Sequence, residues 1–180
     1  MKKTLVYRER CEKSRNIFRK RIRRIASENL VYVDECGIDQ YLFREYARAP
    51  RGQAVMGQVS GKKFKRTNIV AGLCCRKWIA PLQYEDSTDA ALFEFWFENC
   101  LLKEIGCGKY IVLDNARFHR KSVLTELAAR YKCKVIFLPP YSPDLNPIEN
   151  KWAWLKQKLR DILPQFDSLD QAICIAFQVE

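Results

Sequence analysis

Runs of apolar residues that end in an acid indicate the first strands of this chain. Residues 30–34, LVYVD, and 110–114, YIVLD, are continuous rather than alternating in hydrophobicity. Such runs are typical of strands buried on both faces of a sheet. Similar runs predict three more strands, at residues 41–46, 67–75 and 135–138.

Helical spacing of apolar residues separates the later strands. Ser87-Thr88-Asp89 offers N-caps for a helix to about Glu104, and further helices are predicted at 122–131, from 147 onward and at 168–179. A turn at Glu35-Cys36-Gly37 leaves only a short connection after the first strand, which predicts an antiparallel pair. The order predicts an α/β sheet with three antiparallel-connected strands followed by parallel ones.

Composition predicts one domain with a substantial core, because 48% of the 180 residues are hydrophobic. The sequence has no apolar run long enough to span a bilayer and no signal segment at its start. We therefore expect a soluble protein of the cytoplasm. The eight cysteines form no C-x-x-C pair, and with one histidine they favour buried reduced thiols over a zinc site.

The net charge of +11 is concentrated at the N-terminus. Residues 1–27 hold eleven Lys or Arg, including Arg19 and Arg23, and only two Glu. We interpret this segment as a basic arm or linker whose weakly packed helix contacts nucleic acid through phosphates. The alternative is a solvated helix, since four residues predict an apolar stripe on one helical face: Ile17, Phe18, Ile22 and Ile25.

A second basic segment precedes the third predicted strand. It contains Lys62, Lys63, Lys65 and Arg66 around one aromatic residue. Its glycines are spaced one residue too closely for a phosphate-binding loop, and Lys63 stands where such a loop has Ser or Thr. Contact with DNA phosphates and an exposed basic turn are equally good interpretations.

A proline-rich loop joins the last predicted strand to the helix after it. Four prolines fall between residues 139 and 147, and each fixes its own φ angle, so the loop holds one conformation at low entropic cost. Asn146, Pro147 and Glu149 fit an N-cap, a first helical residue and an acid at the third position. Taken alone, Glu149 only completes a capping box.

Three carboxylates are predicted to meet at one edge of the sheet. The carboxyl ends of parallel neighbouring strands lie side by side, which brings Asp34 and Asp114 together. Each Asp alone is explained as a turn residue. With Glu149 leaving the same edge, three uncompensated acids require raised pKa values or a cation. Mg²⁺ prefers oxygen ligands, and two such ions can activate a nucleophile and stabilise the leaving oxygen of a phosphodiester.

Three blocks of the sequence also resemble a known family. VYVDECG, VLDNARFH and LPPYSPDLNPIENKW are similar to the signature blocks of DDE transposases of the mariner-like superfamily, especially its bacterial insertion-sequence branch. The 34 residues between Asp114 and Glu149 match the family's spacing. The resemblance extends from about residue 28 to the C-terminus.

The resemblance implies a ribonuclease H-like fold, a mixed five-stranded sheet flanked by helices. It further implies metal-dependent cleavage of transposon ends and strand transfer into target DNA, at TA dinucleotides. Asp34, Asp114 and Glu149 are then the catalytic, metal-binding triad for two Mg²⁺ ions, with Mn²⁺ as a substitute. Asn115, His119 and Asn146 match family positions, and we expect them to position the loop or the DNA, or else to support the triad and pack. Glu35 is left out because it points to the opposite face of its strand.

One departure from the family concerns the N-terminus. Members usually carry a helix-turn-helix region that recognises the element ends, and the chain is expected to lack it, with residues 1–27 as a linker and 28–180 as the catalytic domain. The expected partners are double-stranded DNA and either a second copy of the chain or a recognition-domain subunit, in a bacterial nucleoid. The alternatives are a catalytically silent DNA-binding or regulatory fragment and a structure-selective nuclease on the same fold.

Overall fold

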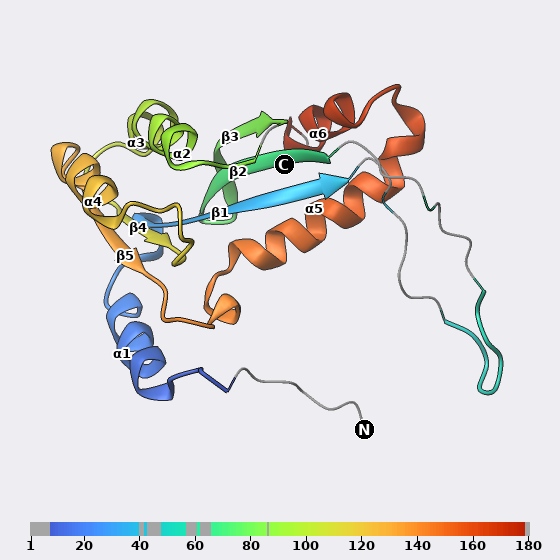
Figure 1. The fold of residues 1–180 in the computed structure, drawn as a ribbon, viewed down its shortest axis with the longest axis horizontal. Helices are drawn as coiled ribbons and strands as arrows, with labels where there is room; N and C mark the ends of the chain where they lie inside the picture. The colour runs from blue at the N-terminus through green and yellow to red at the C-terminus, as the bar shows by residue number, and fades with distance from the viewer. Residues whose placement is uncertain are drawn as a thin grey trace.

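A mixed β-sheet forms the centre of the protein (Figure 1). The computed structural model describes residues 8–39, 42, 48–56, 61, 66–85 and 87–178. Within these residues one sheet has five strands in the order β3-β2-β1-β4-β5, with β1, β2 and β3 antiparallel and β1, β4 and β5 parallel. The strands are β1 Leu30–Asp39, β2 Arg66–Cys74, β3 Lys77–Tyr84, β4 Tyr110–Leu113 and β5 Lys134–Phe137. The predicted mixed five-stranded sheet is confirmed, whereas the predicted pairing of residues 30–34 with 41–46 is not tested by the described residues.

The first strand is longer than predicted. β1 continues to Asp39, so the predicted turn at Glu35-Cys36-Gly37 is wrong. The strand persists because Cys36 and Ile38 are buried and pair with β2. The predicted strand at 41–46 lies outside the described residues, apart from Leu42.

β3 was not predicted. It follows β2 through a tight turn in which Cys75 and Arg76 both have positive φ angles. The strand contains Pro81, whose missing N–H normally rules out a central strand. β3 tolerates this residue because it is the edge of the sheet.

Helices cover both faces of the sheet. They are α1 Glu12–Ile22, α2 Ala90–Trp96, α3 Leu102–Ile105, α4 Lys121–Arg130, α5 Ile148–Ile162 and α6 Leu169–Gln178. One face of β1 and β4, including Val31, Val33 and Ile111, packs on the segment from α2 to α4. The other face of β1 and β2 packs on α5 and α6. In Figure 1, α5 runs alongside β1 from the end of the loop that follows β5.

The predicted helix at 87–104 is present as α2, a π-helical turn Phe97–Leu101 and α3. Asp89 caps it, since its side chain accepts a hydrogen bond of 2.8 Å from the Leu92 N–H. Trp96 is completely buried and donates its ring N–H to the Ala80 carbonyl of β3 at 2.7 Å, which ties the helix to the sheet edge. In the described ranges, no helix has the length and apolar character needed to cross a membrane.

α1 packs firmly on the domain, which corrects the expectation of a weakly packed arm. Phe18 is buried in a cluster with Leu30 of β1, Val112 of β4 and Ile136 of β5. Ile22 and Ile25 lie against the same cluster. Ile17, also part of the predicted stripe, is 61% exposed. Figure 1 shows α1 beside β5, next to the loop that leads to α5.

The cysteines are all free thiols, as expected, but most of them are not buried. Cys36 and Cys133 are buried, and Cys74 and Cys100 are partly buried. The other four are exposed: Cys11, Cys75, Cys107 and Cys174. The expectation of buried thiols was therefore wrong for these four; Cys11 and Cys107 do not lie in apolar runs.

Candidate active site

Asp34 and Asp114 lie at matching positions of two parallel strands. The register pairs Tyr32 of β1 with Val112 of β4; Asp34 lies two residues further along β1, and Asp114 directly follows the last residue of β4. Side chains two residues apart share a face, so both acids project on the face that α5 covers. The structure thus brings the two predicted aspartates together.

The third acid, Glu149, enters the same site from the first turn of α5. One cavity of about 400 Å³ is lined by Asp34, Asp114, Glu149, Asn115, Ala116, Asn146 and residues 138–143. Its wall is the proline-rich loop, which begins at Leu138, where the backbone N–H donates to Leu113 of β4 at 2.8 Å. The loop therefore leads directly from the sheet edge to the glutamate.

Glu149 does not complete a capping box. That motif requires the Glu149 carboxylate to accept from the Asn146 N–H, but this N–H donates to the Pro143 carbonyl at 2.8 Å. Asn146 is buried, and its side-chain oxygen has no hydrogen-bond partner among the described residues, so the predicted side-chain cap is also wrong. The Asn146 backbone carbonyl instead accepts from the Glu149 N–H at 3.2 Å. The Glu149 carboxylate is left to line the cavity.

Burial and neighbouring negative charge act strongly on Asp34. Desolvation has the largest effect, and the carboxylates of Glu35, Glu149 and Asp114 add to it, raising the pKa of Asp34 to about 8. An acid with this pKa is largely protonated at neutral pH unless a cation compensates its charge. The repulsion predicted for the three acids is therefore present.

His119 connects Asp114 to a fourth carboxylate, that of Glu35. Its Nδ1 lies 3.1 Å from Asp114 Oδ1, and its Nε2 lies 3.2 Å from Glu35 Oε1. Burial favours the neutral ring, but the contacts with Asp114 and Glu35 outweigh it and raise the pKa of His119 to about 9. The Phe93 and Phe118 rings pack against the imidazole, with centroids 4.3 and 4.5 Å away.

Asp114 keeps its negative charge in this arrangement. Burial opposes ionisation, but His119, the Ala116 N–H and Lys121 outweigh it, so the pKa of Asp114 is lowered. The Ala116 N–H donates to Asp114 Oδ1 at 2.9 Å. The two strand-end aspartates thus have opposite pKa shifts, which are set by their different partners.

Glu35, which was left out of the predicted site, contacts the site indirectly through His119. Alternation along β1 does place Glu35 on the opposite face from Asp34. The chain returns after β4, however, and sets His119 between Glu35 and Asp114. The only available sequence signal was the single histidine five residues after Asp114.

Asn115 holds the ends of the two last strands together. Its side-chain N–H donates to the Leu138 carbonyl at 2.5 Å, and its side-chain oxygen accepts from Lys121 Nζ at 2.6 Å. These bonds fix the beginning of the proline-rich loop relative to Asp114. A positioning role for Asn115 therefore stays a prediction, with these two bonds as its structural basis.

The predicted DNA-contacting residues are dispersed. Arg19 lies on α1 near Asn16 and Glu12, and Arg23 is exposed just after that helix. Arg66 pairs with Asp39 at the far end of β1, roughly 16 Å along the strand from Asp34. Lys62, Lys63 and Lys65 lie outside the described residues. None of the three described arginines lines the cavity.

The donor types at the cavity suit a hard divalent cation. Asp34, Asp114 and Glu149 all offer carboxylate oxygens, which Mg²⁺ and Mn²⁺ prefer, and a cation would relieve the charge that raises the pKa of Asp34. In the part of the chain that the structure describes, no three His, Cys, Asp or Glu side chains are close enough to form a ready-made metal site. Ligation would therefore require the carboxylates to draw together around the ion.

The family follows from the sequence match. Residues 29–173 match the model described as DDE superfamily endonuclease, and the chain belongs to this family. A relative, the uncharacterized protein y4pE/y4sA of Sinorhizobium fredii (strain NBRC 101917 / NGR234), is 31% identical over 74 residues. This alignment covers 40% of the chain and 53% of the relative, so only about half of that protein is represented.

Solved structures of a mariner transposase share the fold. The Mos1 transposase paired-end complex with left transposon end superposes with a TM-score of 0.77 at 18% identity, covering 100% of this chain and 59% of that one. The catalytic domain of Mos1 mariner transposase gives a TM-score of 0.63 at 16% identity, covering 94% and 79% of the two chains. A Mos1 paired-end complex with Mn gives 0.68 at 16% identity, covering 99% and 62%. The predicted ribonuclease H-like fold is confirmed by these structures, and the predicted DDE family is confirmed by the sequence match.

Proposed function

We propose that this chain is the catalytic domain of a DNA transposase. It cleaves phosphodiester bonds at the ends of a mobile element and transfers the freed ends into target DNA, using divalent metal ions. The family match and the transposase fold support the class of protein. The cleavage and joining reactions are inferred from the site.

The observation that carries the proposal is the meeting of Asp34, Asp114 and Glu149 at one cavity. Strand register explains the pairing of the two aspartates, and the hydrogen bonds of Asn146 remove the capping explanation for Glu149. No structural role accounts for burying Asp34 among like charges, which raises its pKa to about 8. Such perturbed carboxylates in a cavity are typical of active sites.

Asp34, Asp114 and Glu149 would hold the ions, most simply two Mg²⁺ with Mn²⁺ as a substitute. When bound, these ions supply a nucleophile at neutral pH and stabilise the leaving oxygen of the phosphodiester. The Mos1 complexes with Mn and with Mg support the choice of ions.

The chain's own residues orient this chemistry. In the cleavage step a water oxygen attacks phosphorus, the bond to the 3′ oxygen breaks, and that oxygen leaves as a 3′-hydroxyl after taking a proton. In the joining step the 3′-hydroxyl loses its proton and its oxygen attacks a phosphorus of target DNA; the bond from that phosphorus to the target's 3′ oxygen breaks, and this oxygen leaves as a 3′-hydroxyl after taking a proton. His119 and the Ala116 N–H hold the Asp114 carboxylate in place, and Asn115 holds the proline-rich loop that forms the wall.

The proposed substrate is double-stranded DNA from both the element ends and the target. The titles of the matched Mos1 complexes name a transposon end and strand transfer, which supports this choice. Pairing with a second copy, or with a subunit that recognises the ends, is part of the proposal. A bacterial insertion sequence is the proposed source, with the protein acting at the nucleoid in the cytoplasm.

The test uses a substrate that needs no end recognition. Purified protein is incubated with supercoiled plasmid and Mn²⁺, and nicked product is measured for the wild type, Asp114→Asn and Glu126→Gln. Glu126 is an exposed acid on α4 that does not line the cavity. We expect nicking by the wild type and Glu126→Gln, and its loss in Asp114→Asn. Equal nicking by wild type and Asp114→Asn would exclude this site.

A silent regulatory fragment gives a different result. In that case neither the wild type nor Asp114→Asn nicks the plasmid, and the two proteins bind DNA equally in a gel-shift assay. This outcome would overturn the catalytic proposal and favour the regulatory alternative.

A further inference from the structure

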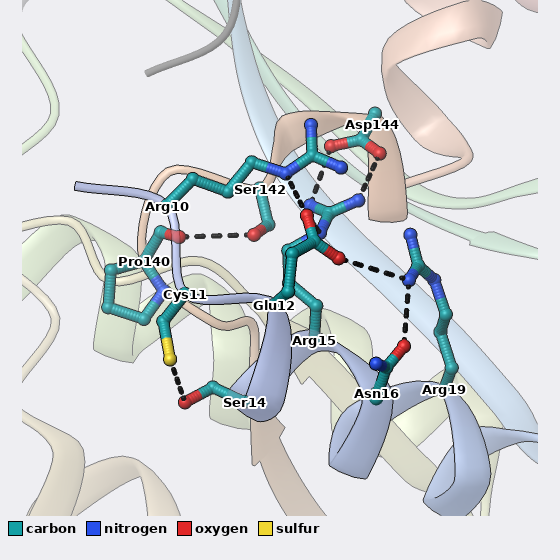
Figure 2. Close-up of polar contacts among 10 residues, drawn as sticks. All are labelled: Arg10, Cys11, Glu12, Ser14, Arg15, Asn16, Arg19, Pro140, Ser142 and Asp144. Atoms are coloured by element: carbon teal, nitrogen blue, oxygen red, sulfur yellow. Dashed lines mark hydrogen bonds and ion pairs between the residues drawn. The ribbon is translucent and has the colours of Figure 1, made fainter. Parts of the chain in front are cut away.

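A partly buried ion pair joins α1 to the loop that carries Glu149. Arg15 of α1 is completely buried, and its guanidinium makes two parallel hydrogen bonds to Asp144, of 2.8 Å to Oδ1 and 2.5 Å to Oδ2 (Figure 2). The two residues are 129 positions apart in the chain. A bidentate pair of this kind fixes both distance and orientation.

The ion pair belongs to a cluster of charged side chains between α1 and the loop. Glu12 lies between the guanidinium groups of Arg10, at 2.6 Å, Arg15, at 3.3 Å, and Arg19, at 3.7 Å. In Figure 2 these side chains extend from α1 and the residues before it towards the turn that contains Asp144. The Arg15 guanidinium also holds the pKa of Asp144 below its usual range, so the pair is charged at neutral pH.

Asp144 is linked to Glu149 by consecutive backbone hydrogen bonds. Asp144 belongs to the 3-10 turn Pro143–Leu145, and the Asn146 N–H after it donates to Pro143 at 2.8 Å. The Asn146 carbonyl then accepts from the Glu149 N–H at 3.2 Å. A displacement of Asp144 would therefore move the first turn of α5.

The two ends of the loop are held by different parts of the protein. The end near β5 is fixed from within the sheet, by Asn115 on the Leu138 carbonyl. The end near α5 is held by Arg15, with Leu145 packed against the cluster that contains Phe18. Burying an arginine costs free energy, and a well-packed apolar residue at this position would stabilise the fold at least equally. The orientation of the loop is what the ion pair adds.

We propose that Arg15 and Asp144 form a latch through which α1 holds Glu149 in position for metal binding. Both are positioning residues that act through Glu149, and the inference rests on the proposed function of that glutamate. Through the latch, α1 contributes to the geometry of the active site. Breaking it weakens divalent-ion binding and leaves the chemistry at saturating metal largely unchanged.

The test measures Mn²⁺ affinity by calorimetry and plasmid nicking as a function of Mn²⁺ concentration. The variants are Arg15→Met, Asp144→Asn and the double variant, with Lys20→Gln as a control that removes an exposed cation from the same helix. Each single latch variant should weaken Mn²⁺ binding about tenfold, which is the lower end of effects seen for residues supporting metal ligands. The double variant should be no weaker than either single variant, because both remove the same interaction.

The rate at saturating Mn²⁺ should stay within about twofold of the wild type, a split that a general loss of folded protein would not produce. Thermal unfolding in EDTA gives the folded fraction of each variant. Asp144 is half-exposed, so Asp144→Asn tests the latch even if Arg15→Met does not fold.

Unchanged Mn²⁺ affinity in Asp144→Asn, additive effects in the double variant, or an equal loss in Lys20→Gln would overturn the latch. Glu149→Gln separates this failure from failure of the proposed function. If the wild type binds no Mn²⁺, or binds it as tightly after Glu149→Gln, both proposals fall. If Glu149→Gln weakens binding and Asp144→Asn does not, only the latch falls.

Discussion

Asp34 and Asp114 each lie two residues after the last pair that joins β1 to β4, yet their pKa values shift in opposite directions. Asp114 is stabilised as an anion because His119, the Ala116 N–H and Lys121 together outweigh its burial. Asp34 is surrounded by other carboxylates and is more stable when protonated. The pair can therefore hold one negative charge readily and a second one only with a cation present.

This difference predicts that the metal-free protein loses stability as pH rises. The pKa of Asp34 is about 8 in the folded state and near 3.9 when unfolded, so the folded state binds the additional proton between these values. Stability falls wherever the folded state binds more protons, so the loss runs from about pH 4 to about pH 8. Asp34→Asn should remove the contribution of Asp34 to this slope, leaving the fall above about pH 6.5 that the raised pKa of His119 contributes, and raise the free energy of unfolding at pH 8 by on the order of a few kcal/mol. Urea denaturation in EDTA measures it.

The control for this experiment is Glu126→Gln, which removes an exposed carboxylate that does not line the cavity. It should leave the pH dependence of the wild type unchanged. A wild-type stability that rises between pH 5 and pH 8 would contradict the environment described for Asp34.

The single histidine permits a direct measurement of its own pKa. Burial alone would lower the pKa of His119, but the carboxylates of Asp114 and Glu35 outweigh burial and raise the pKa to about 9. Proton NMR of the metal-free protein should show one imidazole titrating near that value. Glu35→Gln should lower the pKa, because it removes one of the two carboxylates. An unchanged titration in Glu35→Gln would show that Glu35 does not contact the ring in solution.

α1 should contribute to the stability of the domain through Phe18. Replacing this buried residue by alanine should lower the free energy of unfolding by about 3 kcal/mol, from lost burial and the cavity left behind. Ile17→Ala, on the exposed side of the same helix, should change it by less than about 0.5 kcal/mol. Equal effects of the two substitutions in urea denaturation would mean that the helix does not pack as described.

Much of the fold was predictable because its central strands are buried on both faces. The runs at 30–34 and 110–114 could only be interior strands, and they correspond to the paired parts of β1 and β4. β3 was not predicted because Pro81 and Lys77 are typical of an edge strand rather than a central one. The sequence does not show which strand lies at the edge of the sheet. The turn predicted at Gly37 failed because a glycine in a strand looks the same, in sequence, as one in a turn.

The acids of the site were predictable because each one follows a buried apolar run or begins a helix, and in parallel neighbouring strands such positions lie side by side. Arg15 was not, since it lies in a run of similar cations and its partner is 129 residues away. Glu35 was missed for a related reason. Its link to Asp114 depends on where the loop after β4 places His119, and that position is determined by packing against Phe93 and Phe118.

The last prediction concerns the coupling of metal binding to pH. A divalent ion must displace the proton from Asp34, so its apparent affinity should fall about tenfold for each pH unit below the pKa of about 8. At ten times the dissociation constant the ion stabilises the folded state by about 1.4 kcal/mol, and this gain shrinks as affinity falls. The rise in melting temperature caused by a fixed Mn²⁺ concentration should therefore be larger at pH 8 than at pH 6. In Asp34→Asn the rise should be small at both pH values. An equal rise at both pH values in the wild type, retained in Asp34→Asn, would place the ion at another site.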